Sequence, residues 1–176
     1  MGFNKLAHCI GDAPIVLRSL TNLAPLPVVV VASPALADII RREHPFATLI
    51  MNAHPERGMT HSLRLAMPHI VPHAAVAVCL ADVPLVTARD VITLEHARAA
   101  AAVDVAFPVR HGQPGHPVIF GIHARGFVAS SPDGDTLRHL RDAVFLKRVR
   151  VKDEREEPYL DIDTPRDLER YAAHVN

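Results

Sequence analysis

The stretch AAVAVCLADVP, residues 74–84, decides the fold class. Its first seven residues are apolar without alternation, which is typical of a strand covered on both faces in a parallel sheet. The apolar run ends at Asp82, and Pro84 then prevents the strand from simply continuing. An acidic residue therefore stands at the carboxyl end of a buried strand, where ligands bind in sheets of this kind.

Predicted strands and helices alternate on either side of this segment. Further apolar runs predict strands over residues 27–32, 47–51 and 103–109. Helices are predicted over residues 33–43, 58–66 and 88–101. Ser33 and Thr87 stand at N-cap positions, and Pro34 stands at a first helical position. This alternation predicts right-handed βαβ units, and therefore an α/β fold with a mostly parallel sheet between helices.

The last third of the chain is less regular. We expect an extended segment over residues 115–120, a helix over 135–143, a short strand over 159–163 and a helix from Pro165. No repeat, low-complexity tract or linker divides the chain. Residues 1–176 are therefore expected to form a single domain.

The charge balance and the apolar runs limit the classes of partner. Nineteen basic residues balance nineteen acidic ones, so the net charge gives no general attraction to nucleic acid or to an anionic membrane. The longest strongly apolar run, residues 28–32, is far shorter than the ~20 residues of a membrane helix, and no signal-peptide pattern opens the sequence. We expect a cytoplasmic protein. Cys9 and Cys79 form no metal-binding or redox motif, and Cys79 is expected to be a buried thiol.

Three aspartates suggest a metal site. Asp82 ends the apolar run, and Asp161 and Asp163 belong to the segment DIDTP at residues 161–165. Mg²⁺ prefers oxygen ligands and is typically held by one or two carboxylates together with substrate phosphates. The alternative is structural: Asp82 is a turn residue, and Asp163 or Thr164 caps the final helix.

Six short motifs follow one another along the chain, and none of them is diagnostic alone. They are MGxxK at residues 1–5, GMxxSL at 58–63, LxDxPL at 80–85, GHPV at 115–118, GD at 134–135 and DIDTPxDL at 161–168. As an ordered set they resemble the MobA-like nucleotidyltransferases, and within that family the molybdenum cofactor cytidylyltransferases. The resemblance implies a Rossmann-like nucleotide-diphospho-sugar transferase fold.

The resemblance also implies a reaction and the residues that serve it. A phosphate of the acceptor attacks the α-phosphate of a nucleoside triphosphate in the presence of Mg²⁺, and pyrophosphate leaves. The protein contributes mainly positioning and charge neutralisation. Lys5 and Asp82 match the catalytic positions. The nucleotide-binding positions correspond to Gly2, Lys5, Gly58, Met59, Ser62 and Asp82, the acceptor-binding positions to Gly115, His116 and Pro117, and the metal ligands to Asp82, Asp161 and Asp163.

Each matched position also has a structural interpretation that the residues leave open. Lys5 can be a solvated surface lysine, and Gly58 with Ser62 can form an ordinary turn and helix start. His116 can contact the phosphate of a pterin, or it can be a structural imidazole bonded to backbone. Residues 133–136, DGDT, are interpreted first as the cap of the following helix and second as a substrate contact.

One feature departs from the family. Its members begin with a buried strand that runs into a phosphate-binding loop, LAAGxSxR, ahead of the MGxxK motif, whereas this sequence starts at Met1. We expect the first strand and the phosphate loop to be missing. Either Met1 is an internal methionine of a longer natural chain, or the protein is short and has lost triphosphate binding. In both cases the 176-residue form is expected to have weak or no transferase activity.

Two classes of function remain open. The first is an enzyme that transfers CMP from CTP to molybdopterin or the molybdenum cofactor; GTP and another phosphate-bearing acceptor stay open as its substrates. The second is a non-catalytic molybdenum-cofactor binding or delivery protein for a molybdenum hydroxylase. A NAD-linked oxidoreductase lacks the GxGxxG fingerprint that such enzymes carry.

Overall fold

The structure is a computed structural model that describes residues 5–45, 47–156 and 161–175. Its α-helices are α1 Ile15–Leu23, α2 Pro34–Glu43, α3 Met59–Ala66, α4 Ala88–Ala100, α5 Ile122–Ser130, α6 Leu137–Asp142 and α7 Pro165–Val175. Its strands are β1 Cys9–Ile10, β2 Ala13–Pro14, β3 Val29–Ala32, β4 Thr48–Met51, β5 Val76–Val78, β6 Val105–Arg110, β7 Gln113–Pro114, β8 Val118–Phe120 and β9 Arg148–Lys152. Short 3-10 helices are η1 Lys5–Ala7, η2 Pro55–Arg57 and η3 Met67–His69. No described helix combines the length and the apolar character that a membrane crossing requires.

The main sheet is built around β6. This strand pairs parallel to β9 and antiparallel to β8, and β8 pairs antiparallel to β5. Strands β5, β6 and β9 therefore point the same way, and β8 opposes them. β3 and β4 form a second, parallel pair in which Val29 lies opposite Thr48. By strand direction this is the mostly parallel α/β fold that the alternation of elements predicts.

Strand β8 opposes its neighbours because of the tight turn between β6 and β7. His111 and Gly112 have positive φ angles, 47° and 80°. They form a two-residue hairpin in which Arg110 lies opposite Gln113. Such a turn joins only antiparallel strands, since a parallel return needs a crossover of a dozen or more residues. The chain then continues in the reversed direction into β8, within the segment predicted to be extended.

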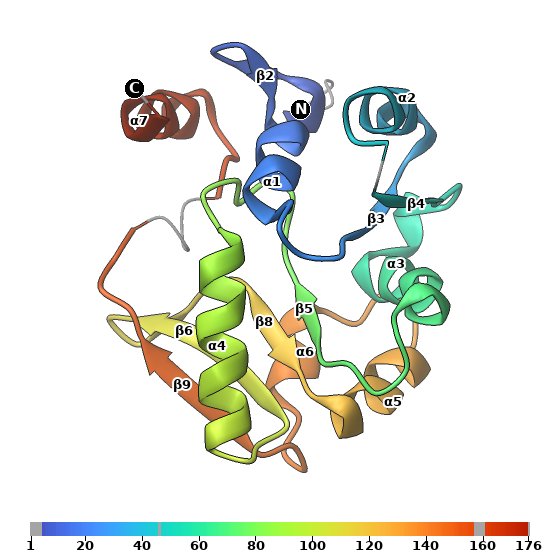
Figure 1. The fold of residues 1–176 in the computed structure, drawn as a ribbon, viewed down its shortest axis with the longest axis vertical. Helices are drawn as coiled ribbons and strands as arrows, with labels where there is room; N and C mark the ends of the chain where they lie inside the picture. The colour runs from blue at the N-terminus through green and yellow to red at the C-terminus, as the bar shows by residue number, and fades with distance from the viewer. Residues whose placement is uncertain (1–4, 46, 157–160, 176) are drawn as a thin grey trace.

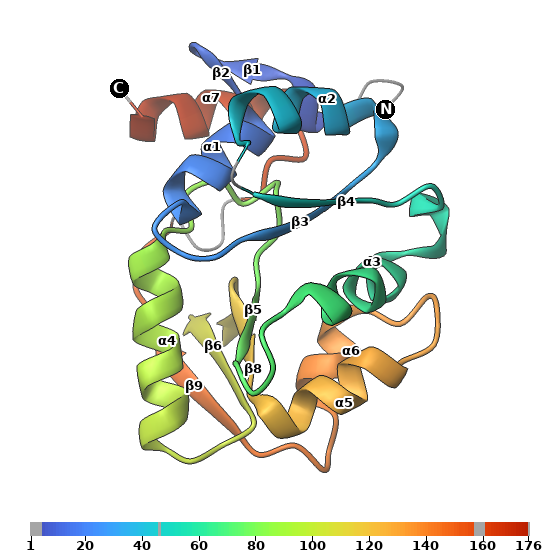
Figure 2. The same ribbon diagram turned by 45° about the vertical axis from the view of Figure 1, so that its right-hand side comes forward.

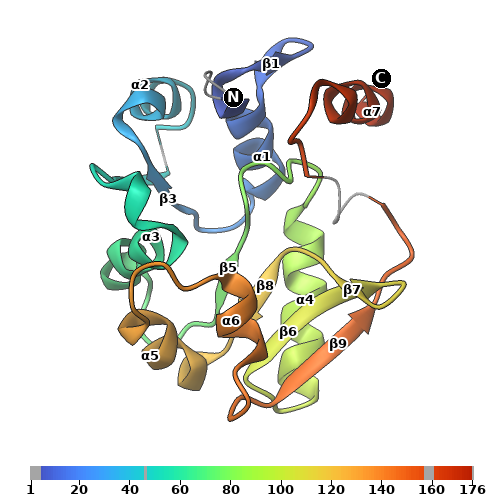
Figure 3. The same ribbon diagram turned by 180° about the vertical axis from the view of Figure 1, so that it is seen from behind.

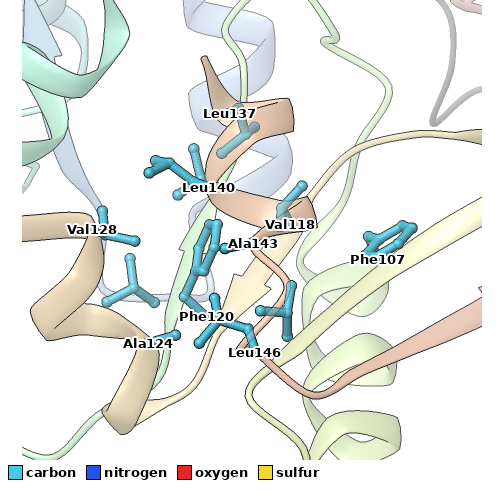
Figure 4. Close-up of a cluster of buried hydrophobic side chains, with 12 residues drawn as sticks. Phe107, Val118, Phe120, Ala124, Val128, Leu137, Leu140, Ala143 and Leu146 are labelled. Atoms are coloured by element: carbon cyan, nitrogen blue, oxygen red, sulfur yellow. The ribbon is translucent and has the colours of Figure 1, made fainter. Parts of the chain in front are cut away.

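Side chains of the central strands alternate between two helical layers. Phe107 and Phe120, which are 1% and 0% exposed, pack with residues of α5 and α6 (Figure 4). Ala106 and Ile119 point the other way and pack with Leu94 of α4. Figures 1 and 3 show α4 on one face of the sheet and α5 with α6 on the other. Because both faces are covered, the strands are apolar on both sides, which explains the uninterrupted apolar runs.

β3 and β5 each have a strand partner on one side only, among the residues that the structure describes. β3 pairs with β4, β5 pairs with β8, and no backbone hydrogen bond joins β3 to β5. Figure 2 shows β3 and β4 crossing above β5, beneath α2. Residues 29–31 of β3 are only half-buried. Each of these two strands therefore keeps one unpaired edge among the described residues.

Two predicted helix starts differ in how they are capped. At α4 the Thr87 side chain accepts a hydrogen bond from the Asp90 N–H, and the Asp90 carboxylate accepts one from the Thr87 N–H at 2.8 Å. This capping box confirms the prediction. Ser33 stands at the N-cap position of α2, but its side chain forms no capping hydrogen bond. The fixed φ of Pro34 is the local feature that favours this helix start.

The strand predicted over residues 159–163 is wrong for its described part. Residues 161–163 form no strand, and residues 159 and 160 lie outside the described residues. The strand that lies beside β6 comes earlier in the chain, as β9, with Val105 opposite Arg148. Its sequence RVRVK alternates charged and apolar residues, as expected for an edge strand covered on one face.

Candidate functional site

Lys5 connects two aspartates from distant parts of the chain. Its Nζ donates hydrogen bonds to Asp82 Oδ2 at 2.9 Å and to Asp163 Oδ1 at 2.6 Å. Lys5 begins η1, Asp82 follows β5, and Asp163 precedes α7. The Ile162 N–H also donates to the backbone oxygen of Asp82 at 3.0 Å, which holds the two aspartate segments side by side.

Asp161 belongs to the same group of charges. Burial raises the pKa of the Asp161 carboxyl, and the negative charges of Asp82 and Asp163 raise it further. Burial lowers the pKa of Lys5, but the hydrogen bonds to Asp163 and Asp82 outweigh burial, so the pKa of Lys5 is raised overall. Two carboxylates thus bond to one ammonium group, and the charges of these groups act on a third carboxylate, that of Asp161. The set of Lys5, Asp82, Asp161 and Asp163 is called the acidic cluster below.

The acidic cluster suits a divalent cation by its chemistry but not by the present positions of its side chains. Carboxylate oxygens are the ligands that Mg²⁺ prefers. Within the described ranges, however, no three His, Cys, Asp or Glu side chains converge on a common metal position. The Lys5 ammonium lies between Asp82 and Asp163. A metal ion can therefore bind both carboxylates only when Lys5 turns away from them.

The capping of α7 engages neighbours of these aspartates. The Asp167 carboxylate accepts hydrogen bonds from the Thr164 N–H at 2.8 Å and from the Asp163 N–H at 3.2 Å. The Thr164 hydroxyl accepts one from the Asp167 N–H at 3.3 Å. Thr164 and Asp167 therefore cap the helix, as the structural alternative allows, while the Asp163 carboxylate bonds to Lys5.

The segment predicted to lie against the nucleotide forms the start of α3. Gly58 has φ 85°, in the left-handed region, and precedes the helix directly. The Ser62 hydroxyl accepts a hydrogen bond from Asn52 Nδ2 at 3.0 Å, and Asn52 Oδ1 accepts one from the His54 N–H at 2.8 Å. Asn52 is 3% exposed and directly follows β4, so it fixes the Ser62 helix against a strand end. Sequence reasoning did not single out Asn52.

Asp133 connects the start of α3 to the loop before α6. Its carboxylate accepts hydrogen bonds from Arg57 at 2.6 Å and from Arg64. The hydrogen bonds from Arg64 and then from Arg57 lower the pKa of Asp133. The cap of α6 is instead Thr136, whose side chain accepts a hydrogen bond from the His139 N–H. The capping prediction for residues 133–136 is thus confirmed for Thr136 and corrected for Asp133. Arg57, Arg64 and Asp133 are called the arginine clamp below.

The predicted acceptor-binding residues Gly115, His116 and Pro117 form a segment that is called the acceptor loop below. It lies between two cavities, and His116 lines both of them. A cavity of about 370 Å³ is lined by Gln113, Pro114, Gly115, His116, Val118, Leu137, Arg138, Arg141 and Asp161. A second cavity of about 360 Å³ is lined by Arg89, Asp90, Thr93, Leu94, Pro108, His116, Pro117, Val151, Asp153 and Arg155. The first, called the acceptor cavity below, joins the acceptor loop to the acidic cluster through Asp161.

His116 is the predicted site residue with the most unusual environment. Burial lowers the pKa of its imidazole, the charge of Asp82 opposes this shift, and the charge of Arg141 adds to it. Its Nδ1 atom is buried and has no hydrogen-bond partner among the described residues. A buried polar atom without a partner is rare in proteins and is typical of places where a further group binds.

The predicted site residues fall into two groups. Lys5, Asp82, Asp161 and Asp163 come together, and the acceptor cavity brings Gly115 and His116 to the same place. Gly58, Met59 and Ser62 stand at α3, where the arginine clamp connects them to the loop before α6. Gly2 lies outside the described residues.

Three solved structures have a fold similar to that of this chain. A homologue of Mycobacterium tuberculosis Rv0371c from Mycobacterium sp. strain JC1 is 22% identical, with a TM-score of 0.82 over 99% of this chain and 89% of that one. Rv0371c of M. tuberculosis H37Rv in complex with manganese is 18% identical, with a TM-score of 0.78 over 96% and 91% of the two chains. Molybdopterin-guanine dinucleotide biosynthesis protein A of Archaeoglobus fulgidus is 19% identical, with a TM-score of 0.72 over 99% and 91%. At these identities the likeness shows the fold, which is that of nucleotidyltransferases with a Rossmann-like sheet.

Sequence comparison places the chain in a family. A comparison with the curated proteins gives no match. The sequence does match the MobA-like NTP transferase domain over residues 1–150, which include Asp82 and the acceptor loop. The protein therefore belongs to the MobA-like NTP transferase family and has a nucleotidyltransferase-type domain.

Proposed function

We propose that the protein transfers a nucleoside monophosphate, CMP from CTP, to a phosphate-bearing acceptor of the molybdopterin type. An oxygen of the acceptor's phosphate forms a bond to the α-phosphorus, the bond from that phosphorus to the β-phosphate oxygen breaks, and pyrophosphate leaves. The observation that carries this proposal is the acidic cluster next to the acceptor cavity, with Asp161 belonging to both.

The acidic cluster is assigned the charge chemistry. Asp82, Asp161 and Asp163 are the residues that would hold Mg²⁺, which supplies positive charge to the phosphates when bound. Manganese in the complex of the similar protein Rv0371c supports a divalent cation. Lys5 is assigned to the phosphates: its ammonium leaves the carboxylates when a cation takes its place and then neutralises phosphate charge.

The remaining predicted residues position the two substrates. Gly58 lets the backbone approach a ligand closely, and Ser62 and Met59 follow on the first turns of α3. Gly2 and Lys5 belong to the same nucleotide-binding set. Gly115, whose N–H donates to Pro108 O at 2.9 Å, holds the acceptor loop against β6. His116 follows it in the same loop and lines the acceptor cavity together with Asp161. Positioning and neutralisation of this kind supply most of the catalysis in phosphoryl-type transfers.

The test is pyrophosphate release from CTP, GTP and ATP with Mg²⁺ and molybdopterin. The chain is compared with one extended upstream in the native reading frame, and we expect release with CTP in the extended chain. Asp163→Asn, which removes one carboxylate of the cluster, should lower that release roughly hundredfold. Asp38→Asn is the matched control, because Asp38 is exposed and pairs only with Arg41 among the described residues. Equal rates in the two variants would contradict the assignment of the cluster.

Two further outcomes have defined meanings. Molybdopterin binding without pyrophosphate release, from any of the three nucleotides, favours the non-catalytic delivery protein for a molybdenum hydroxylase. Release that occurs only in a chain extended upstream in the native reading frame supports the expectation that the 176-residue form lacks a phosphate-binding loop.

A further inference from the structure

We propose that the acceptor cavity binds the phosphate group of the acceptor and that Arg138 is the side chain that recognises it. The inference rests on the proposed function and adds the residue that selects a phosphorylated acceptor over an unphosphorylated one. The family motifs along the chain do not include Arg138, which lies on α6.

The cavity lies where an attacking phosphate is needed. The acceptor loop and α6 supply most of its walls, and Asp161 of the acidic cluster supplies the rest. The residue after Asp161 bonds to the backbone oxygen of Asp82, through the Ile162 N–H at 3.0 Å, so the cavity and the carboxylates of the cluster are neighbours. A phosphate held here is therefore beside the carboxylates to which the metal and the nucleotide are assigned.

The charges that line the cavity favour an anion. Arg141 is already satisfied: its Nε and Nη2 donate to Asp142 at 2.9 and 2.6 Å, and its guanidinium lies 4.9 Å from the centre of the Phe107 ring. Arg138 is exposed and has no hydrogen bond or ion pair with any described residue. Two arginines face a single carboxylate in this lining, Asp161. A free guanidinium offers the paired donors that match two oxygens of a phosphate.

The cavity on the other side of His116 provides the contrast. Its Arg155 donates to Asp90 at 2.6 Å and to Asp153 at 2.7 Å, so two carboxylates satisfy one guanidinium. Arg89 is exposed there and has no partner among the described residues. That lining holds two aspartates, against one in the acceptor cavity, so its charge favours a phosphate less.

His116 supplies the second contact. Its buried Nδ1 has no partner among the described residues, and when the ring turns toward the cavity the N–H form of this atom can donate a hydrogen bond to a phosphate oxygen. Arg138, from α6, and His116, from the acceptor loop, line the same cavity. Together they offer charge and a directed donor, the combination by which proteins recognise phosphate monoesters.

The experiment follows the imidazole signal of His116 by NMR while orthophosphate is added to the full chain. The chain has twelve histidines, so a His116→Asn variant assigns the resonance. We expect a saturable shift of the His116 signal in the native protein. Arg138→Gln should weaken the apparent phosphate affinity roughly tenfold, Arg138→Lys should restore part of it, and Arg89→Gln, the matched control, should leave it unchanged. Arg138 is exposed, so its substitution does not disturb the core.

Several outcomes would overturn the inference. These are a His116 signal that does not respond to phosphate, an equal affinity in the native and Arg138→Gln proteins, and a loss in Arg89→Gln as large as in Arg138→Gln. Displacement of phosphate by CTP with Mg²⁺ would also overturn it, because the cavity would then belong to the nucleotide. If CTP fails to bind while Arg138-dependent phosphate binding persists, the phosphate site stands and the proposed transferase function falls.

Discussion

The acidic cluster and the arginine clamp are both made of side chains from distant segments, yet their charges are balanced in opposite ways. In the acidic cluster a single ammonium group, that of Lys5, faces three carboxylates. In the clamp a single carboxylate, that of Asp133, faces two guanidinium groups, and Arg64 also donates to the backbone oxygen of Ser131.

The pKa shifts report this difference. Burial and the neighbouring aspartates raise the pKa of Asp161, so ionising it in the folded protein is unfavourable. Hydrogen bonds from Arg64 and Arg57 lower the pKa of Asp133, so its ionised form is favoured. An aspartate whose ionised form is disfavoured is typical of a place where a cation is to bind, whereas two arginines hold Asp133 in its ionised form, as in a structural ion pair. The two regions therefore predict different results for the same aspartate-to-asparagine change.

The largest effect is expected for Asp82→Asn compared with Asp133→Asn. Asp82→Asn should lower kcat for nucleotidyl transfer about 10²–10³-fold with little change in Tm, because it removes charge that acts on the reacting phosphates. Asp133→Asn should lower Tm and raise KM for the nucleotide with kcat retained, because it loosens the loop that carries Gly58. Steady-state kinetics gives kcat and KM of both variants, and thermal unfolding gives their Tm. A loss of kcat in Asp133→Asn as large as in Asp82→Asn would remove the distinction between the two regions.

A smaller effect is expected when the cation of the acidic cluster is removed. Lys5→Met should tighten Mn²⁺ binding in the absence of nucleotide, because the ammonium no longer competes for Asp82 and Asp163. The gain should be roughly tenfold at most, because Lys5 is partly exposed. Nucleotidyl transfer should fall in the same variant, because the phosphates lose a positive charge. The free Mn²⁺ signal in electron paramagnetic resonance gives the affinity directly.

Lys152→Met is the control for this change. Lys152 is 86% exposed and pairs with Glu154 at 2.8 Å, away from the acidic cluster. Its loss should leave both Mn²⁺ affinity and transfer unchanged. Weaker Mn²⁺ binding in Lys5→Met would show that Lys5 supports the metal site instead of competing with the metal.

What the sequence predicts well is local. The apolar runs at β3 and β5 and the N-cap at Thr87 are complete within a few consecutive residues, and the sequence predicts each of them. β9 was missed because its alternating RVRVK lacks an apolar run. Helices α1 and α5 were missed because Pro14 and Gly121, and no Ser, Thr, Asp or Asn, stand at their N-cap positions, and because α5 contains Gly126 in its interior.

The site residues also divide into those that a local sequence pattern identifies and those that only the structure brings together. Asp82, Asp161 and Asp163 could be grouped because each follows a recognisable motif, and the carboxyl end of a buried strand identified the edge at which to look for them. The arginine clamp could not, since Arg57 and Arg64 are 76 and 69 residues from Asp133 and no local pattern pairs them. The sequence does not single out Arg138 either, because an arginine on an exposed helix turn has no distinctive pattern until the cavity beside it is known.

The smallest effect is the pH dependence of stability, where the two regions should show opposite signs. The raised pKa of Asp161 means that the folded state resists ionisation, a stabilising preference that is present below the ordinary value of 3.8 and is lost as the pH rises through the folded-state pKa. Asp161→Asn should therefore raise Tm at pH values above the folded-state pKa of Asp161 and leave Tm unchanged below pH 3.8.

The lowered pKa of Asp133 has the opposite effect. It gives stability that is present above pH 3.8 and is lost as the pH falls through the folded-state pKa. Asp133→Asn should therefore lower Tm at neutral pH and match the native protein in strong acid. Thermal unfolding of the three proteins across this pH range tests both expectations. Shifts of the same sign in both variants would mean that the folded protein favours the ionised form of Asp161, as it does that of Asp133.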